Sequence, residues 1–242
     1  MINNNFSNNL INTYSLFIKN SAGQAEKFYE PKEEVKTAIF YINDLHGRSS
    51  KLQYLKSAAD SFSKTFQSNP SIDSFKLAGG DIEIGSEHKK NKLMIEFSNQ
   101  LGLDFTAIGN HELDSGAKTF SDQIENAKYK YISTNLEIDP QSYLYKRIQD
   151  KTIAKSWIIE KNGHYYGFIG ASPIDLKARL DARSASDGLS VYDYEITQKK
   201  IQEEVNKLKN RNINKIIMLS HLGLDLDRKI AANVSGIDII IG

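Results

Sequence analysis

Short apolar runs, each followed at once by residues that can bind metal ions, constrain this chain more than any other feature. The runs are continuous rather than alternating, which is typical of parallel strands buried on both faces. Amphipathic helical patterns separate the first runs from one another. Because ligands of open α/β sheets bind beyond the carboxyl ends of the strands, the polar residues are expected to meet at one edge. Four of the runs are followed by such polar segments, which are residues 44–48, 79–81, 109–114 and 220–223.

The order of the predicted elements indicates the fold class. Strands are predicted at 37–42, 75–78, 105–108 and 131–134, separated by helices at 50–66, 89–101 and 116–127. A hairpin is predicted next, with strands 156–160 and 165–169 joined by Asn162-Gly163 in a type I′ turn. A loop at 172–192, a helix at 195–210, a strand at 215–219, a helix at 225–233 and a strand at 237–241 follow. This order predicts an α/β class domain over 36–242, layered, with mixed β-sheets flanked by helices.

Composition excludes several classes of site. The 242 residues include no Cys, so disulfides and thiolate metal sites are ruled out, and a net charge of +1 gives no basis for binding a nucleic acid polymer or an anionic membrane. No apolar stretch approaches the roughly 18 residues that span a bilayer. Residues 1–35 are rich in Asn, Ser, Lys and Glu and are predicted to form a flexible N-terminal extension without a leader peptide, which makes a cytoplasmic location the default expectation.

The polar segments contain a set of oxygen and nitrogen ligands without sulfur. Asp44 and His46 are separated by one residue, so on an extended strand end both side chains would point the same way. A carboxylate such as Asp81 has two oxygens and can bridge two cations. This set suits two divalent metal ions of the Mn, Zn, Fe or Mg class. Its members are Asp44, His46, Asp81, Asn110 and His221.

These blocks, taken together and in this order, resemble those of the calcineurin-like metallophosphoesterase superfamily. Residues 42–48 and 109–116 resemble its 5′-nucleotidase branch in particular, and the resemblance covers roughly residues 37–242. It implies a hydrolase that cleaves a small-molecule phosphoester, expected to be a nucleotide, through a hydroxide activated by two metal ions. By this resemblance Asp44 and His46 would bind the first metal, Asp81 would bridge, and Asn110 and His221 would bind the second.

The resemblance also implies two catalytic residues outside the ligand set. His111 would face the substrate and either stabilise developing charge or protonate the leaving oxygen. Asp114, three residues later, would hold the His111 ring and keep it cationic. An alternative is that Asp114 caps the helix that follows Gly116.

The pattern of the superfamily continues beyond the last strand with a Gly-His-x-His block, and its 5′-nucleotidases carry a second, nucleoside-binding domain. The printed sequence ends at Gly242 without either, so we expect a metallophosphoesterase domain that is incomplete at its C-terminus. Alternative functions are a 2′,3′-cyclic nucleotide phosphodiesterase or a nucleotide-sugar hydrolase using the same site. A non-catalytic scaffold with an incomplete metal site is a further alternative, and the oligomeric state is left open.

Other polar residues have simpler expected roles. His88 and His164 are predicted to be surface residues, the latter in the hairpin turn. Glu83 is predicted to be solvated in a loop. Glu112 is expected to bond to backbone near the site without taking part in the chemistry.

Overall fold

The computed structural model describes residues 17–19, 25–27, 35–85, 87–176 and 187–242. By its internal contacts the chain divides into two units, residues 1–36 and 37–242. In the first unit, strands β1 (Phe17–Lys19) and β2 (Ala25–Lys27) pair in antiparallel fashion. A flexible extension was predicted over residues 1–35. Apart from these two strands and residue 35, that range lies outside the described residues.

The second unit contains a five-stranded sheet in the order β3-β4-β5-β6-β8. Pairings from β4 through β8 are parallel, as the continuous apolar runs predict. Its strands are β3 (Lys36–Ile42), β4 (Ile72–Ala78), β5 (Phe105–Ala107), β6 (Lys130–Ile132) and β8 (Ile153–Ala154).

A four-stranded sheet of order β13-β12-β10-β9 forms the other half of this unit. It is mixed, because β10 pairs with β12 in parallel and with β9 in antiparallel fashion. The turn between β9 and β10 has positive φ at both Asn162 (49°) and Gly163 (86°), as the predicted type I′ turn requires. The strands are β9 (Ser156–Lys161), β10 (His164–Ala171), β12 (Ile216–Ser220) and β13 (Ile239–Ile241).

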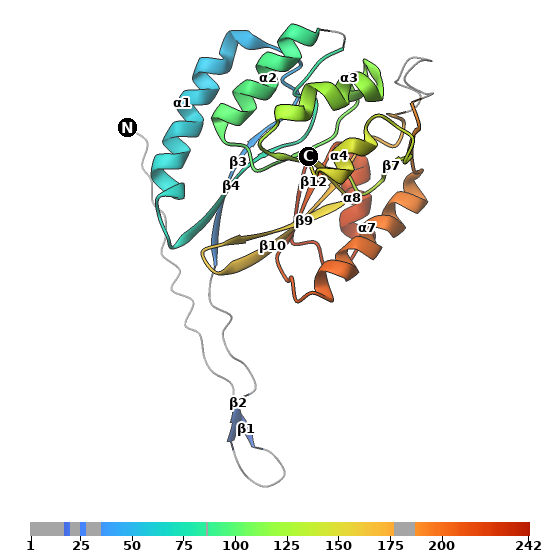
Figure 1. The fold of residues 1–242 in the computed structure, drawn as a ribbon. Helices are drawn as coiled ribbons and strands as arrows, with labels where there is room; N and C mark the ends of the chain where they lie inside the picture. The colour runs from blue at the N-terminus through green and yellow to red at the C-terminus, as the bar shows by residue number, and fades with distance from the viewer. Residues whose placement is uncertain (1–16, 20–24, 28–34, 86, 177–186) are drawn as a thin grey trace. The chain divides into compact units, whose positions relative to one another are not determined.

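Helices cover the outer face of each sheet (Figure 1). Helices α1 (Leu52–Phe62), α2 (His88–Leu101) and α3 (Gly116–Gln123) bury residues in the core of the first sheet, and α7 (Tyr194–Lys209) and α8 (Leu224–Asn233) in that of the second. Irregular helical turns extend or precede these helices at η1 (Ser49–Lys51), η2 (Ser63–Gln67), η3 (His111–Leu113) and η4 (Ile124–Asn126). No helix among the described residues is long and apolar enough to span a bilayer.

The inner faces of the two sheets pack together through aromatic rings. Phe105 of β5 stacks on Phe168 of β10 with ring centroids 4.3 Å apart, and Phe75 of β4 meets the Phe168 ring edge-on at 5.1 Å. The unit therefore has four layers, helix, sheet, sheet and helix, which is the predicted class of layered mixed sheets flanked by helices. The sequence order alone does not show that the chain divides its strands between two sheets.

Short elements between residues 135 and 192 were not predicted. They are β7 (Leu136–Ile138), α4 (Tyr145–Gln149) and β11 (Leu189–Val191), of which β7 and β11 pair in antiparallel fashion. Strand β8 was also missed, because two residues are too short to show a period. The predicted loop at 172–192 includes β11, and its residues 177–186 lie outside the described ones.

A buried carboxylate joins the hairpin to the first sheet near the start of β4. Asp73 accepts hydrogen bonds from the Asn162 amide (2.9 Å), the His164 ring (2.8 Å) and the Tyr166 hydroxyl (2.7 Å). Asp73 is 2% exposed. The side chain of His164 is 29% exposed, so it lies at the surface in part as expected, but its ring also binds this carboxylate, which the sequence did not indicate.

Replacing Asp73 with Ala should lower the free energy of unfolding by about 2–4 kcal/mol, because three donors lose their shared acceptor. Urea unfolding followed by circular dichroism measures the change. Asp60→Ala is the control, since the Asp60 carboxylate is half exposed on α1 and pairs with Lys56 at the surface, so little change is expected there. Equal effects in both variants would contradict the assigned role of Asp73.

Candidate metal and phosphate site

The predicted ligand residues come together from both sheets. Asp44 follows β3, Asp81 follows β4 and Asn110 follows β5, all in the first sheet, whereas His221 follows β12 in the second. The loops are joined by backbone hydrogen bonds, because Asp44 N donates to Gly80 O (3.2 Å) and His46 N donates to Asp81 O (2.9 Å). The site thus lies where the strand ends of the two sheets converge.

Three of the predicted ligand residues have left-handed backbones. The φ angles are 52° for Asp44, 48° for His46 and 52° for Asp81. Such conformations are uncommon for residues other than Gly and cluster at functional sites. The argument from alternation along an extended strand is therefore wrong for Asp44 and His46, because β3 ends at Ile42 and a turn brings their side chains together.

Asp81 is the centre of the cluster, and its side chain is 4% exposed. Its Oδ2 lies 3.3 Å from Nε2 of His221, 3.7 Å from Nε2 of His46 and 4.0 Å from Nε2 of His111. Its Oδ1 accepts a hydrogen bond from the backbone N–H of His111 (2.9 Å). Burial raises the pKa of Asp81, but the His221 and His111 contacts outweigh burial and hold it below its ordinary value.

His221 is oriented by the backbone of the Asp81 loop. Its Nδ1 lies 2.7 Å from the carbonyl oxygen of Gly79, which can only accept, so Nδ1 carries the proton and Nε2 is directed at Asp81. Burial lowers the pKa of His221, but the hydrogen bond and charge of Asp81 outweigh burial and raise it to about 9. A ring that donates from one nitrogen to a backbone carbonyl and turns the other nitrogen toward a cluster of ligand residues is an arrangement that metal-binding histidines share.

His111 and Asp114 form a pair beside the ligand cluster. The Nδ1 of His111 lies 2.5 Å from Oδ2 of Asp114, which also accepts from the backbone N–H of Gly85 (3.0 Å). Burial lowers the pKa of His111, but Asp114 and Asp81 more than offset it, so the net shift is upward. Asp114 does not cap the next helix, because the residue at the start of α3 is Ser115.

The donor atoms form two groups that could each hold a metal ion, and both groups include Asp81. One contains His46, Asp81 and His111, and the other contains Asp44, Asp81 and His221, with ligand atoms within 4.8 Å of one another in each, as found among the described residues. This division places His111 with His46, unlike the division that the sequence resemblance implies. Asn110 is 6% exposed and directly precedes His111.

Two buried glutamates lie near the site, of which Glu112 bonds to backbone as expected and Glu83 does not fit its expectation. Glu112, 3% exposed, accepts backbone hydrogen bonds from both ligand loops, and Glu83 is fully buried with one oxygen receiving the Tyr131 hydroxyl at 3.1 Å. The expectation that Glu83 is solvated is wrong, because the polypeptide after Asp81 turns inward rather than outward. Burial and then the neighbouring Glu112 carboxylate raise the pKa of Glu83 well above its ordinary value.

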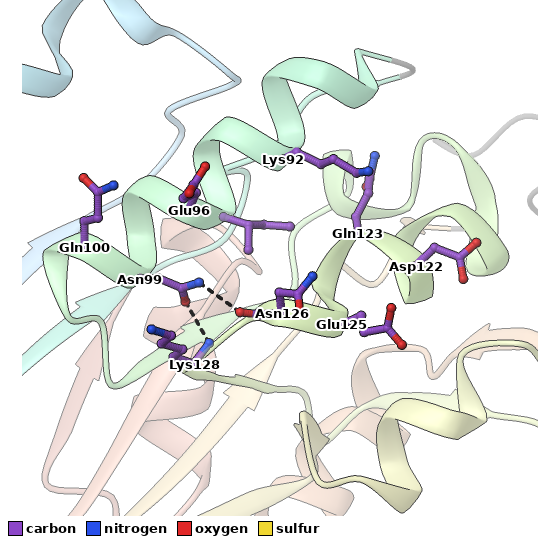
Figure 2. Close-up of a pocket in the computed structure, with 10 residues that line it drawn as sticks. Lys92, Glu96, Asn99, Gln100, Asp122, Gln123, Glu125, Asn126 and Lys128 are labelled. Atoms are coloured by element: carbon purple, nitrogen blue, oxygen red, sulfur yellow. Dashed lines mark hydrogen bonds between the residues drawn. The ribbon is translucent and has the colours of Figure 1, made fainter.

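A large hollow lies away from this site. It is found between α2 and the α3–η4 segment, has a volume of about 750 Å³, and is drawn in Figure 2. Asn99 within it donates to Asn126 O (2.9 Å) and accepts from Lys128 N (2.7 Å). Its lining carries charges of both signs and includes none of the predicted site residues. The volume of a hollow therefore does not identify the candidate site in this chain.

Several curated proteins with similar sequences are 5′-nucleotidases. The 5′-nucleotidase of Rattus norvegicus is 33% identical over 153 residues, covering 60% of this chain and 24% of the relative. A probable 5′-nucleotidase of Treponema pallidum (strain Nichols) is 28% identical over 168 residues, covering 68% of this chain and 27% of the relative. The chain spans about a quarter of the length of the curated relatives it matches. No protein-family model matches the sequence.

Solved structures share the fold. A 5′-nucleotidase precursor from Thermus thermophilus superposes with a TM-score of 0.70 at 22% identity, covering 84% of this chain and 40% of that one. A calcineurin-like phosphoesterase from Bacillus subtilis gives a TM-score of 0.65 at 20% identity, covering 84% and 70%. NAD nucleotidase from Haemophilus influenzae gives 0.68 at 22% identity, covering 84% and 37%. These matches confirm the fold class and the resemblance to the 5′-nucleotidase branch of the metallophosphoesterases.

Proposed function

We propose that this chain provides the metal centre and the general acid of a phosphoester hydrolase that acts on nucleotides. The observation that carries the proposal is the oxygen of Asp81, which faces imidazoles from three separate segments of the chain, His46, His111 and His221. A buried carboxylate that faces several imidazoles brings together oxygen and nitrogen donors that suit a divalent cation.

The residues present fit two divalent ions that share Asp81. The donors are carboxylate oxygens and imidazole nitrogens, a set that suits Mn, Zn or Fe, with Asn110 adding a neutral oxygen. Asp44, half exposed on its side chain, leaves one side of the cluster open to solvent. Ions bound here would supply a Lewis acid for the phosphoryl group and lower the pKa of water.

His111 is the proposed general acid. Asp114 orients its ring and favours the cationic form, so His111 can donate a hydrogen bond to a phosphoryl oxygen or a proton to the leaving oxygen. The His46 and His111 rings lie 4.7 Å apart between centroids, which keeps this proton close to the proposed metal ligands. His111 is therefore proposed as a catalytic residue and Asp114 as its positioning partner.

The proposed substrate is a small phosphoester with a nucleoside leaving group. This part rests on the relatives, of which several are 5′-nucleotidases and one structural neighbour is an NAD nucleotidase. A panel of AMP, NAD and a 2′,3′-cyclic nucleotide separates the three activities. Release of inorganic phosphate from AMP is the expected preference.

Replacing His111 with Ala should lower kcat for AMP by about 10²- to 10⁴-fold, the usual contribution of a general acid. The Mn²⁺-loaded chain is assayed for phosphate release, and metal content is measured on the same sample. His88→Ala is the matched control, because His88 is exposed at the start of α2 and should leave turnover unchanged. An unchanged kcat in His111→Ala, or no phosphate release by the unsubstituted chain saturated with Mn²⁺, would contradict the proposal.

A further inference from the structure

The two loops that carry Asp81 and Asn110 touch backbone to backbone. A methyl group built on Gly80 would lie 2.7 Å from the backbone nitrogen of Gly109, and one built on Gly109 would lie 2.8 Å from the backbone nitrogen of Asp81. Glycines on both sides therefore permit an approach that no larger residue would allow. The distance between the two loops sets the distance between the ligands they carry.

One side chain spans this contact. Glu112, in the η3 turn, accepts with Oε2 from the backbone N–H of Gly109 (2.8 Å) and of Asp81 (2.9 Å), and with Oε1 from that of Ile82 (2.8 Å). A single carboxylate thus binds donors from both loops. A carboxylate is the only side-chain group with acceptor positions on both oxygens and no donor when ionised.

The connection between the loops is reciprocal. Asp81 on the first loop accepts through Oδ1 from the backbone N–H of His111 on the second, while Glu112 on the second accepts from the backbone N–H of Asp81. These bonds orient the Asp81 carboxylate so that Oδ1 contacts the second loop and Oδ2 faces the histidine rings of the cluster. Because Asp81 also has a left-handed backbone, its conformation needs these bonds to persist.

We infer that Glu112 is a positioning residue that fixes the Asp81 loop against the Asn110 loop and so sets the geometry in which the proposed metal centre binds its ions. The effect of Glu112 on metal binding rests on the proposed function, whereas the hydrogen bonds of Glu112 to both loops do not. A residue that only supported folding would alter stability and leave the metal affinity of the folded molecules unchanged. Substituting a residue that positions a metal ligand instead lowers metal affinity by about 10- to 100-fold.

Glu112→Gln tests the inference with little change in volume. The amide keeps one acceptor oxygen and presents an NH₂ group where the other oxygen was, so the N–H groups of Gly109, Asp81 and Ile82 cannot all keep an acceptor. Glu204→Gln is the matched control, because Glu204 of α7 is also a buried glutamate and binds the Ser156 hydroxyl of β9 (2.6 Å) and Lys207 of α7 (2.8 Å). Both variants are compared at a temperature well below their unfolding midpoints.

Two readouts are measured on the 242-residue chain. Mn²⁺ titration calorimetry should show a Kd about 10- to 100-fold higher in Glu112→Gln and unchanged in Glu204→Gln. Amide hydrogen exchange of the metal-free protein should be about 10-fold or more faster in Glu112→Gln alone, either at Ile82 or at Asp81 and Gly109, whichever N–H groups face the new NH₂. Because exchange needs no metal, it reports the contact independently of the proposed function.

The outcomes separate the two proposals. Unchanged exchange at these three amides, or an unchanged Kd alongside faster exchange, would overturn the positioning role of Glu112. Equal rises in Kd for Glu112→Gln and Glu204→Gln would also overturn it, by tracing the effect to general destabilisation. If the unsubstituted chain binds no Mn²⁺, the proposed metal centre fails, and the exchange rates alone decide whether Glu112 holds the loops.

Discussion

Replacing Asp81 with Asn should abolish tight binding of divalent metal ions, an effect larger than the roughly 10- to 100-fold loss that removal of an outer partner causes. Asn keeps the volume and can still accept from the His111 N–H, so the loops should hold their positions. What is lost is the negative charge that faces His46 and His221 within 4 Å. Calorimetric titration with Mn²⁺ measures the loss directly.

The same substitution should change how stability depends on pH in the metal-free protein. Although burial lowers the pKa of His221, Asp81 outweighs burial and raises it from its ordinary 6.5 to about 9. A group whose pKa is raised by folding stabilises the folded state below its unfolded pKa, and this contribution is lost as pH rises through the folded pKa. The unsubstituted chain should therefore lose stability between about pH 6.5 and 9, and Asp81→Asn should lose much less over that range.

Urea unfolding at about pH 6 and about pH 9.5, and NMR titration of the His221 ring, measure this change. Asp73→Asn is the matched control, since Asp73 is also a buried aspartate bound to a histidine, His164, at 2.8 Å, yet lies outside the ligand cluster. It should leave Mn²⁺ binding and the His221 titration as they are. Retained metal affinity in Asp81→Asn, or an unshifted His221 titration, would remove Asp81 from the centre of the site.

The sequence predicted the sheet-forming elements well because their signals are local. Continuous apolar runs ended close to the observed strand ends, and Asn162-Gly163 specified its turn through the positive φ that both residues adopt. The residues predicted as ligands therefore meet, since each follows a strand end. Strand β8, with two residues, and the division of strands between two sheets depend on tertiary pairing that no local pattern encodes.

The sequence failed where burial depends on long-range contacts. Glu83 is polar and lies in a loop, which favours solvation, yet it is buried against Tyr131 from another strand. His164 lies beside a turn, and its partner Asp73 is 91 residues away in the chain. Asp44 and His46 were placed together for the wrong reason, because their contact arises from left-handed backbones after β3 rather than from strand alternation.

Gly109→Ala should damage both stability and metal binding, because the space beside Gly109 is filled by the central ligand. The added methyl would overlap Oδ1 of Asp81 and lie 2.8 Å from its backbone nitrogen. The contacted atoms belong to a backbone and a short side chain that Glu112 and the His111 N–H hold in place, so they cannot move away cheaply. Overpacking of this kind costs about 1–3 kcal/mol of folding free energy.

A control with the same crowding elsewhere isolates the effect on the site. A methyl group on Gly170 of β10 would overlap the carbonyl of Ile132 between the sheets, so Gly170→Ala should lose comparable stability. Its clash does not involve Asp81, so its folded molecules should bind Mn²⁺ as the unsubstituted chain does. Gly109→Ala should instead show a Kd raised by at least about 10-fold at a temperature where both variants are folded. Equal affinities in the two variants would mean that the approach of the Asp81 and Asn110 loops does not govern the metal centre, because only Gly109→Ala forces them apart.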